Sequence, residues 1–479
     1  MKLVLDDEAA MVRLGRDIAA VLSPDDRIGL VGDLGAGKTT LARAILRALA
    51  DDPELEVPSP TFTIVQAYDG AIPVRHIDLY RLSDPSEALE LGIGEPGAVE
   101  LIEWPRENLP ATLRIGFGNS DNARTVEVDG SAFAKRLSRR RAMLDFLGQA
   151  GWASASVVPL KQDASTRSYF RVTRKAERAV LMDAPSFSPC LDHYATRARL
   201  ADGNNDAFLA VGGALRAAHL SAPAIKAADS KAGFLLLEDL GDDKIAVNGQ
   251  PVAERYLAAA DALAAFHENE VPAALPVPGE PGSSPPYRPP RFDADLAVFE
   301  VALFPAWYLG IDPPAEYEAL WRRAIEALPR QDDRLALRDY HSPNCLWLGD
   351  REGSRRVGII DFQDALFAPA AYDVASLAQD ARVPIDDALE DAILARYLAG
   401  RPSLDEALFR HAYHVIGAQR AARISGVFRR LDKRDGKPHY LKYLPVVTRA
   451  LAKNLAATDA LCELAVWFEE HSDVFRAHH

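Results

Sequence analysis

Cysteine is scarce in this sequence. Only three occur among 479 residues, and Cys190, Cys345 and Cys462 lie far apart. Such spacing supports neither a disulfide framework nor a zinc site built from paired cysteines. Free cysteines at this low frequency are typical of a reducing compartment. The scarcity therefore excludes a disulfide-stapled scaffold and predicts a cytoplasmic protein.

Long apolar runs and an excess of positive charge are also missing. No apolar run approaches the ~18 residues of a membrane-spanning helix, and Met1–Asp17 contains acids where a signal peptide has an apolar core. The 55 Lys and Arg residues are outnumbered by 69 Asp and Glu residues, which gives a net charge of −14. We therefore expect neither membrane association nor general nucleic-acid binding by the whole chain.

The sequence does contain enough apolar material for several cores. The apolar fraction is 48%, and the length corresponds to about three domain-sized units. The first part alternates strand and helix signals, whereas a β-rich stretch from about residue 155 leads into mostly helical sequence. We expect a domain boundary near residue 133, giving one domain at 1–133 and a second at 134–479.

A phosphate-binding pattern stands near the start of the chain. Gly32–Thr39, "GDLGAGKT", fits G-x-x-x-x-G-K-[ST] and lies between an apolar strand pattern at Arg27–Gly32 and a helical pattern at Thr39–Ala50. This is the context of a P-loop, in which glycines let backbone N–H groups wrap phosphates, the lysine reaches the β/γ-phosphates and the threonine holds Mg²⁺. The expected nucleotide ligands are Gly32, Gly35, Gly37, Lys38 and Thr39.

Two acids at strand ends are candidates for the rest of this site. Asp78 ends a short apolar stretch, "RHIDLYR", and Glu103 ends another, "VELIEW". An acid beside a P-loop can orient Mg²⁺ or a water, but either of these could instead be a solvated residue at a strand end. His76 fits a packed strand histidine better than a ligand, and the role of Trp104 stays open.

Four motifs in order carry a family resemblance: "GDLGAGKTTLAR", "PSPTFTIV", "HIDLYRL" and "LIEWP". Residues 1 to about 110 resemble TsaE, the ATPase subunit of the bacterial machinery that puts threonylcarbamoyl-adenosine into tRNA. The resemblance implies ATP and Mg²⁺ at Lys38 and Thr39, with Thr40 beside the phosphates and Thr61 in a switch-like loop. It also implies that Asp78 and Glu103 serve the metal and hydrolysis. The implied partners are TsaB- and TsaD-like subunits, with tRNA contacted at most indirectly.

A second nucleotide pattern follows about 300 residues later. Asp339 and Asn344 form D-x-x-x-x-N in "LRDYHSPNCLWL", and Asp361 ends the apolar run of "VGIIDFQD". Phosphoryl transfer of the kinase type needs these three parts: an Asp that takes the proton from a hydroxyl, and an Asn and a second Asp that hold Mg²⁺. His341 and Cys345 within the loop need no catalytic role while Asp339 is available.

This second pattern departs from protein kinases. Leu337 stands where a histidine is common, Phe362-Gln363 follows Asp361, and no lysine occurs in "RAVLMDAP", where the third strand would carry one. Arg171 or Arg167 could compensate. The expected phosphate-covering turn, "DASTRSYF", is rich in hydroxyls, so Ser165 and Thr166 could assist backbone amides.

Residues of roughly 140 to 470 resemble the aminoglycoside phosphotransferase and choline kinase superfamily. Within it they look most like AmgK, the N-acetylmuramate/N-acetylglucosamine kinases of cell-wall recycling, through "DASTRSYFRV", "LLLEDLGDD", "LRDYHSPNCLWL", "GIIDFQDA" and "FRRLDKRDGKPHYL". The resemblance implies that Asp339 is the catalytic base, that Asn344 and Asp361 hold Mg²⁺, and that Glu238 to Leu240 form a hinge beside adenine. A small sugar is the implied acceptor.

Other interpretations of the second domain stay open. It could phosphorylate an aminoglycoside, choline or another alcohol, and an acidic cleft would favour the cationic aminoglycosides, whereas basic residues would favour muramate. It could also be a non-catalytic scaffold for the tRNA complex. The basic runs Lys135–Arg141 and Phe428–Leu444 fit solvated or structural helix segments as well as contacts with tRNA or an anion.

The expected fold class is α/β. A P-loop NTPase domain with a mainly parallel sheet comes first, and a bilobal protein-kinase-like α+β domain of the aminoglycoside phosphotransferase type follows. The two nucleotide patterns differ chemically, which indicates a fusion rather than a duplication. The residues leave open whether the two sites are coupled.

Overall fold

The computed structural model describes residues 1–479 except 83–90, 107–110, 119–122, 161–166, 186–192, 202–203, 279–284, 331 and 477–479. The chain divides into two compact units, Met1–Ser154 and Ala155–His479. No helix in the described ranges combines the length and the apolar character needed to cross a bilayer.

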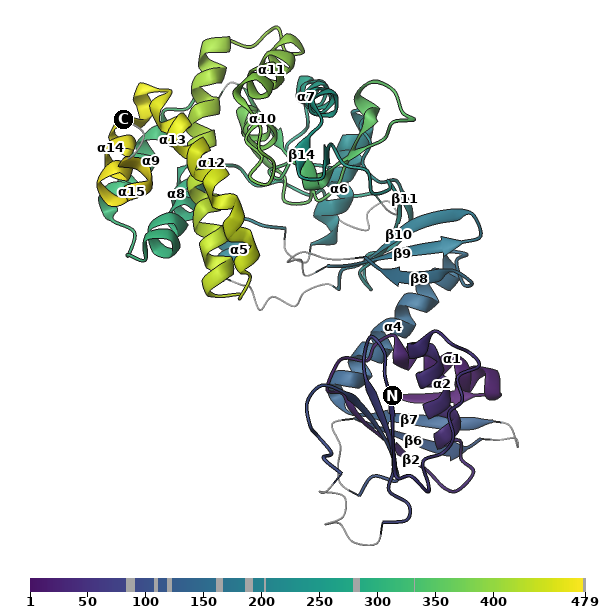
Figure 1. The fold of residues 1–479 in the computed structure, drawn as a ribbon. Helices are drawn as coiled ribbons and strands as arrows, with labels where there is room; N and C mark the ends of the chain where they lie inside the picture. The colour runs from purple at the N-terminus through teal and green to yellow at the C-terminus, as the bar shows by residue number, and fades with distance from the viewer. Residues whose placement is uncertain are drawn as a thin grey trace. The chain divides into compact units, whose positions relative to one another are not determined.

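The first unit is built on a seven-stranded sheet of order β1-β7-β6-β2-β5-β4-β3 (Figure 1). Its centre is parallel, since β2 pairs with β5 and β6 and β4 pairs with β5. Its edges are antiparallel. The described elements are β1 Lys2–Leu5, α1 Glu8–Ala19, β2 Arg27–Val31, α2 Lys38–Ala50, β3 Val65–Tyr68, β4 Val74–Asp78, β5 Val99–Glu103, β6 Ala111–Phe117, β7 Arg124–Asp129 and α4 Ser131–Gln149.

The second unit begins with an antiparallel five-stranded sheet of order β11-β12-β10-β9-β8. Its apolar strand β12 pairs with β10 and β11, so β12 is buried within the sheet. The elements of this lobe are β8 Ser156–Pro159, β9 Ser168–Arg174, β10 Glu177–Asp183, α5 His193–Arg197, α6 Asn205–Ala217, β11 Ile225–Asp229, β12 Phe234–Glu238, β13 Ala246–Val247 and β14 Gln250–Pro251.

The rest of the second unit is mainly helical and carries two short strand pairs, β15–β18 and β16–β17 (Figure 1). A long helix, α12, runs beside α8, α10 and α13. The elements are α7 Ala253–Glu268, α8 Ala294–Val301, the π-helix η1 Phe304–Leu309, α9 Ala315–Glu326, β15 Asp333–Ala336, η2 Ser342–Asn344, β16 Cys345–Trp347, η3 Gly353–Arg356, β17 Val357–Ile359, β18 Leu366–Pro369, α10 Ala371–Ala378, α11 Asp387–Ala399, α12 Glu406–Lys433, η4 Pro438–Tyr443, α13 Leu444–Ala456, η5 Asp459–Leu461, α14 Cys462–His471 and α15 Asp473–Arg476.

The predicted fold class is confirmed, but the division of the structure differs from the expected boundary. It falls after Ser154 rather than near residue 133, because α4 packs on the first unit. Phe133 and Leu137 belong to the core of that unit, and Arg136 forms an ion pair with Asp26 at 2.5 Å. The basic face of α4 therefore serves internal contacts at least in part.

Candidate active sites

The P-loop connects β2 to α2. Gly37 begins the helix in a left-handed conformation, with φ of 106°, which favours glycine. A Cβ atom on Gly32 would lie 2.3 Å from the carbonyl oxygen of Ile115, so only glycine fits there. Gly35 also has a positive φ, 79°. The glycines of the predicted pattern therefore have a steric cause in this structure.

Lys38 is buried at the mouth of this loop. Its Nζ donates to the carbonyl oxygens of Gly32 at 2.8 Å and of Asp33 at 2.9 Å, and it lies 3.8 Å from the ring centre of Trp104. Burial lowers the pKa of Lys38, although Glu103, Asp78 and Asp33 oppose this shift. The ammonium group is thus held at the loop.

The two predicted acids lie side by side because β4 and β5 are parallel neighbours with Asp78 opposite Glu103. Thr39 Oγ1 donates to Glu103 at 2.9 Å, and His76 Nε2 lies 3.0 Å from the same carboxylate. The hydroxyl of Thr61 donates to Asp78 at 2.8 Å. Glu103 is 3% exposed and Asp78 4%, so neither is the solvated acid of the alternative interpretation.

Trp104 takes a backbone conformation that is rare for a large side chain, with φ of 55°. Its ring packs against Tyr80 at 5.1 Å as well as against Lys38. This arrangement was not predictable from the sequence, because it depends on a backbone reversal directly after β5. Thr40, another predicted ligand, lies half-buried in the first turn of α2.

The second site is assembled by the hairpin β16–β17. Asn344 precedes β16 and Asp361 follows β17, and the Ile360 amide donates to the Asn344 carbonyl oxygen at 3.0 Å. The Asn344 side-chain amide donates to the backbone oxygen of Asp339 at 3.0 Å. Three residues that are up to 22 positions apart in the sequence therefore meet in one place.

Two buried acids hold the loop that carries Asp339. Asp373 accepts from the backbone amides of Leu337 at 2.6 Å and Arg338 at 2.9 Å. Asp380 accepts from the amide of Ser342 at 2.9 Å. Both acids come from the α10 region, and no local pattern in the loop sequence predicts their contacts with the loop. They fix the loop backbone on both sides of Asp339.

Basic groups surround Asp339. Burial alone would raise the pKa of Asp339, but Arg423, His341, Arg420 and Arg338 outweigh it and hold this pKa below its usual range. Arg423 Nη2 lies 3.9 Å from the carboxylate. Burial lowers the pKa of His341, so its imidazole is biased toward the neutral form.

Asp361 has the opposite electrostatic setting. Its side chain keeps contact with solvent, yet the protein encloses it enough to raise its pKa, and Asp339 and Asp364 raise it further. A hydrogen bond from Gln363 Nε2 at 2.9 Å and the charge of Arg167 act against this rise. A carboxylate close to other carboxylates attracts a cation, because the cation offsets the repulsion between the negative charges.

The predicted hinge follows β12. Leu240 packs with Leu346, Leu348 and Ile360 in a small apolar cluster. The sequence motifs did not predict this cluster. The Glu238 side chain accepts from Arg351 at 2.5 Å and from the amide of Ala224 at 3.2 Å. Its carboxylate is therefore engaged within the protein, and its backbone N–H donates to the Ala224 carbonyl oxygen at 2.8 Å.

The two candidates for the missing lysine differ. Arg171 pairs with Asp239 and Asp242, each at 2.9 Å, and so braces β9 against the hinge. Arg167 is 6% exposed and carries a charge that acts on Asp361. The predicted ligands Ser165 and Thr166 lie outside the described residues.

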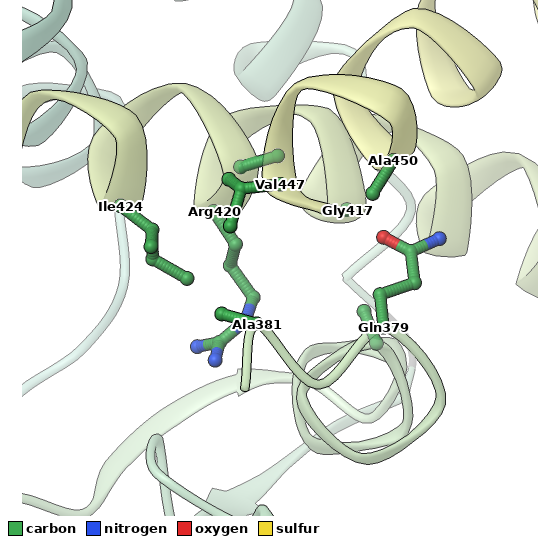
Figure 2. Close-up of a pocket in the computed structure, with 9 residues that line it drawn as sticks. Gln379, Ala381, Gly417, Arg420, Ile424, Val447 and Ala450 are labelled. Atoms are coloured by element: carbon green, nitrogen blue, oxygen red, sulfur yellow. The ribbon is translucent and has the colours of Figure 1, made fainter. Parts of the chain in front are cut away.

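Figure 2 shows how Arg420 reaches from α12 past Ala381. The cavity at this place has a volume of about 10 Å³, room for one water rather than a substrate. Arg420 donates to the carbonyl oxygen of Arg338 at 2.8 Å and to the Ser376 hydroxyl at 2.6 Å. It therefore fastens α12 to the loop of Asp339.

These geometries define two nucleotide-dependent enzymes in one chain: a P-loop ATPase and a phosphotransferase with a kinase-like loop. Among the described residues, no cluster of three or more His, Cys, Asp or Glu side chains forms a metal site. The predicted Mg²⁺ ligands are fewer in each site, as is usual where phosphate oxygens complete the coordination.

Comparison with known proteins agrees with both classes. The family model "Threonylcarbamoyl adenosine biosynthesis protein TsaE" matches residues 5–126, and the model "Phosphotransferase enzyme family" matches residues 156–407. The chain belongs to the TsaE family in its first part and to the phosphotransferase enzyme family in its second.

Individual relatives show the same division. The chain is 38% identical to an N-acetylmuramate/N-acetylglucosamine kinase of Caulobacter vibrioides, over 70% of this chain and 97% of the relative. A kinase of the same description from Pseudomonas aeruginosa is 33% identical over 66% of this chain and 89% of the relative. The tRNA threonylcarbamoyladenosine biosynthesis protein TsaE of Haemophilus influenzae is 36% identical over 26% of this chain and 85% of the relative.

Proposed function

We propose that the second unit transfers the γ-phosphoryl group of ATP to a hydroxyl of an N-acetylated amino sugar, N-acetylmuramate or N-acetylglucosamine. The convergence of Asp339, Asn344 and Asp361 carries this proposal, supported by the 38% identity to an N-acetylmuramate/N-acetylglucosamine kinase. The arginines around Asp339 disfavour a cationic aminoglycoside as the acceptor, because the positive charges of the arginines and of the acceptor would repel each other.

Each residue of the set has a distinct task. Asp339 accepts the proton as the sugar oxygen bonds to phosphorus and the bond to the β-phosphate oxygen breaks, which releases ADP. Asn344 and Asp361 would hold Mg²⁺, which supplies charge neutralisation at the phosphates. The donor set fits, since the Asn344 nitrogen is used on Asp339 and leaves its oxygen for a cation. Glu238 and Leu240 would lie beside adenine.

In this proposal Arg167 replaces the phosphate-binding lysine that is missing from the third strand. It lies directly before β9, and β9 pairs with β10, the strand on which a lysine was expected. Met182 of β10 is fully buried opposite Tyr169. Arg167 is close enough to Asp361, a proposed Mg²⁺ ligand, to lower its pKa, whereas Arg171 braces the hinge acids, so Arg167 is the better placed cation for phosphate oxygens.

We also propose that the first unit hydrolyses ATP within a tRNA-modifying assembly in the cytoplasm. Gly32, Gly35, Gly37, Lys38 and Thr40 would bind the phosphates, with Thr61 near the γ-phosphate. Thr39 and Asp78 would hold Mg²⁺ and Glu103 would position the attacking water.

Exposed apolar side chains support a protein partner at this site. Leu34 of the P-loop is 77% exposed, Phe62 80% and Tyr80 53%, and all three flank residues of the nucleotide site. A contact surface for a partner is the proposed role of these side chains, which stand within two residues of Gly35, Thr61 and Asp78 in the sequence. TsaB- and TsaD-like subunits are the proposed partners.

The kinase test offers N-acetylmuramate, N-acetylglucosamine, kanamycin and choline to the full chain, with Lys38→Ala present to silence the first site. We expect phosphorylated N-acetyl sugar, and a fall of about 10²–10⁴-fold when Asp339→Ala is added. Transfer only to kanamycin or choline would contradict the sugar assignment. No transfer at all would favour a scaffold.

The ATPase test uses Glu103→Gln in a chain whose second site is silenced by Asp339→Ala. We expect ATP binding to persist and hydrolysis to fall by about 10²-fold or more, because the neutral amide cannot accept the proton of an attacking water. Unchanged hydrolysis would exclude the catalytic role of Glu103.

A further inference from the structure

A row of arginines on α12 extends away from Asp339. Arg423 lies 3.9 Å from the Asp339 carboxylate and is held by Glu300, a fully buried acid of α8, at 3.1 Å. Arg430 stands seven residues further along the same helix. Seven residues are about two turns and a rise of about 10 Å, so both side chains project from the same face.

Arg430 is held by an aromatic ring, as its neighbour Arg429 is by Tyr308. Its guanidinium lies 4.2 Å from the ring centre of Tyr194, which in turn packs against Phe299 at 5.4 Å. Its Nε is buried and has no hydrogen-bond partner, and within the described part of the chain no carboxylate lies at ion-pair distance. The aromatic ring fixes the cation without neutralising it.

Tyr194 links this cation to the catalytic loop. The same side chain, which comes from α5, lies within electrostatic reach of Arg423, so Tyr194 connects Arg423, beside Asp339, with Arg430. Arg423 already has Glu300 as its counter-charge, whereas Asp435, an acid within electrostatic reach of Arg430, forms its ion pair with Arg434 at 2.7 Å. A pre-positioned planar cation some 10 Å along the helix from Arg423 suits a carboxylate, which can accept two parallel hydrogen bonds.

We propose that Arg430, positioned by Tyr194, binds the carboxylate of an acidic sugar acceptor, so that the second unit selects N-acetylmuramate over neutral acceptors. The inference rests on the proposed sugar kinase function. N-acetylmuramate differs from N-acetylglucosamine by a lactyl ether that ends in a carboxylate. A hexose with this substituent is long enough to place a hydroxyl at Asp339 and the carboxylate toward Arg430.

The test compares N-acetylmuramate with its neutral primary amide, which has the same shape, and with N-acetylglucosamine. Arg430→Gln is the test variant and Arg429→Gln the matched control, since Arg429 is its neighbour on α12 but packs on Tyr308 instead. We expect the wild-type chain to prefer the acid over the amide by about tenfold or more in kcat/KM. Arg430→Gln should remove this preference and leave N-acetylglucosamine within about twofold, while Arg429→Gln keeps the preference.

Three results would overturn the inference. A wild-type chain that uses acid and amide equally has no carboxylate site. A parallel loss for all three acceptors in Arg430→Gln indicates a structural role for Arg430. Equal effects of Arg430→Gln and Arg429→Gln indicate a general effect of charge. Failure of the wild-type chain to phosphorylate any of the three sugars would instead overturn the proposed function, and this inference with it.

Discussion

Asp339 and Asp361 are carboxylates of one site, yet their surroundings act on them in opposite directions. Arginines and His341 overcome burial and keep the pKa of Asp339 low, whereas enclosure and neighbouring acids raise the pKa of Asp361. Separate pKa values allow two identical groups to do different work at one pH. The difference depends on Arg423 and Arg420, which α12 supplies from outside the motif.

The fall of kinase kcat/KM at low pH should therefore follow the protonation of Asp361. As the pH falls, the group with the raised pKa takes up its proton first, and a neutral Asp361 no longer holds a cation. Arg167 lowers the pKa of Asp361, so Arg167→Met should move the acid limb of kcat/KM to higher pH. A pH profile from 4 to 8 with a saturating metal concentration measures this shift.

Arg171→Met is the matched control for that experiment. It removes the same charge four residues further along the chain, within β9, but Arg171 is engaged by Asp239 and Asp242. We expect its acid limb to coincide with that of the wild-type chain. Equal shifts in both variants would mean that Arg167 has no special relation to Asp361.

At the scale of elements, the contiguous sequence motifs predicted most of the local structure of the two sites. The P-loop, the strands ending at Asp78 and Glu103, and the loop of Asp339 are found where the sequence placed them. The supporting groups were beyond prediction, because Asp373, Asp380, Glu300 and the α12 arginines reach the site from distant elements. Their contacts are set by helix packing, which leaves no fixed spacing in a sequence.

Helix α12 offers a test of this packing. A Cβ atom on Gly426 would lie 2.4 Å from backbone atoms of Leu303, whereas one on Gly213 of α6 would meet Pro278 at 3.6 Å, an ordinary contact. Gly213→Ala should raise the free energy of unfolding by up to about 1 kcal/mol, through helix propensity. Gly426→Ala should lower it by about 1–3 kcal/mol, because the backbone of Leu303 must move.

Calorimetric unfolding of the full chain measures both effects, since transitions of separate units can be resolved. Both substitutions change the same residue type within a helix, so they differ mainly in the space available. Stabilisation by Gly426→Ala to the same extent as by Gly213→Ala would show that α12 does not approach Leu303 this closely. It would also weaken the placement of Arg423, which lies one turn earlier on the same helix.

At the scale of the whole molecule, each unit has its own core. The apolar cluster of the first unit runs from Leu3 to Leu137, and the large cluster of the second runs from Met182 to Phe475. The described residues of the two clusters share no member. Separate cores allow each nucleotide site to be supported by its own unit, whatever the biological reason for joining them.

Independence of the two sites is therefore the expected behaviour of the full chain. Lys38→Ala should leave the sugar kinase kcat/KM within about twofold, and Asp339→Ala should leave ATP hydrolysis by the first unit within the same range, because each site is supported by the core of its own unit. Nucleotide titration of the second site in the wild-type chain and in Lys38→Ala provides the second readout, one dissociation constant with the first site filled and one with it empty. If nucleotide at the first site changed the affinity of the second, the ratio of these two dissociation constants would give the coupling free energy. A ratio of five or more, about 1 kcal/mol, would mean that the fusion transmits information between tRNA modification and sugar phosphorylation. A ratio of one would mean that the shared chain only keeps the two enzymes at equal abundance.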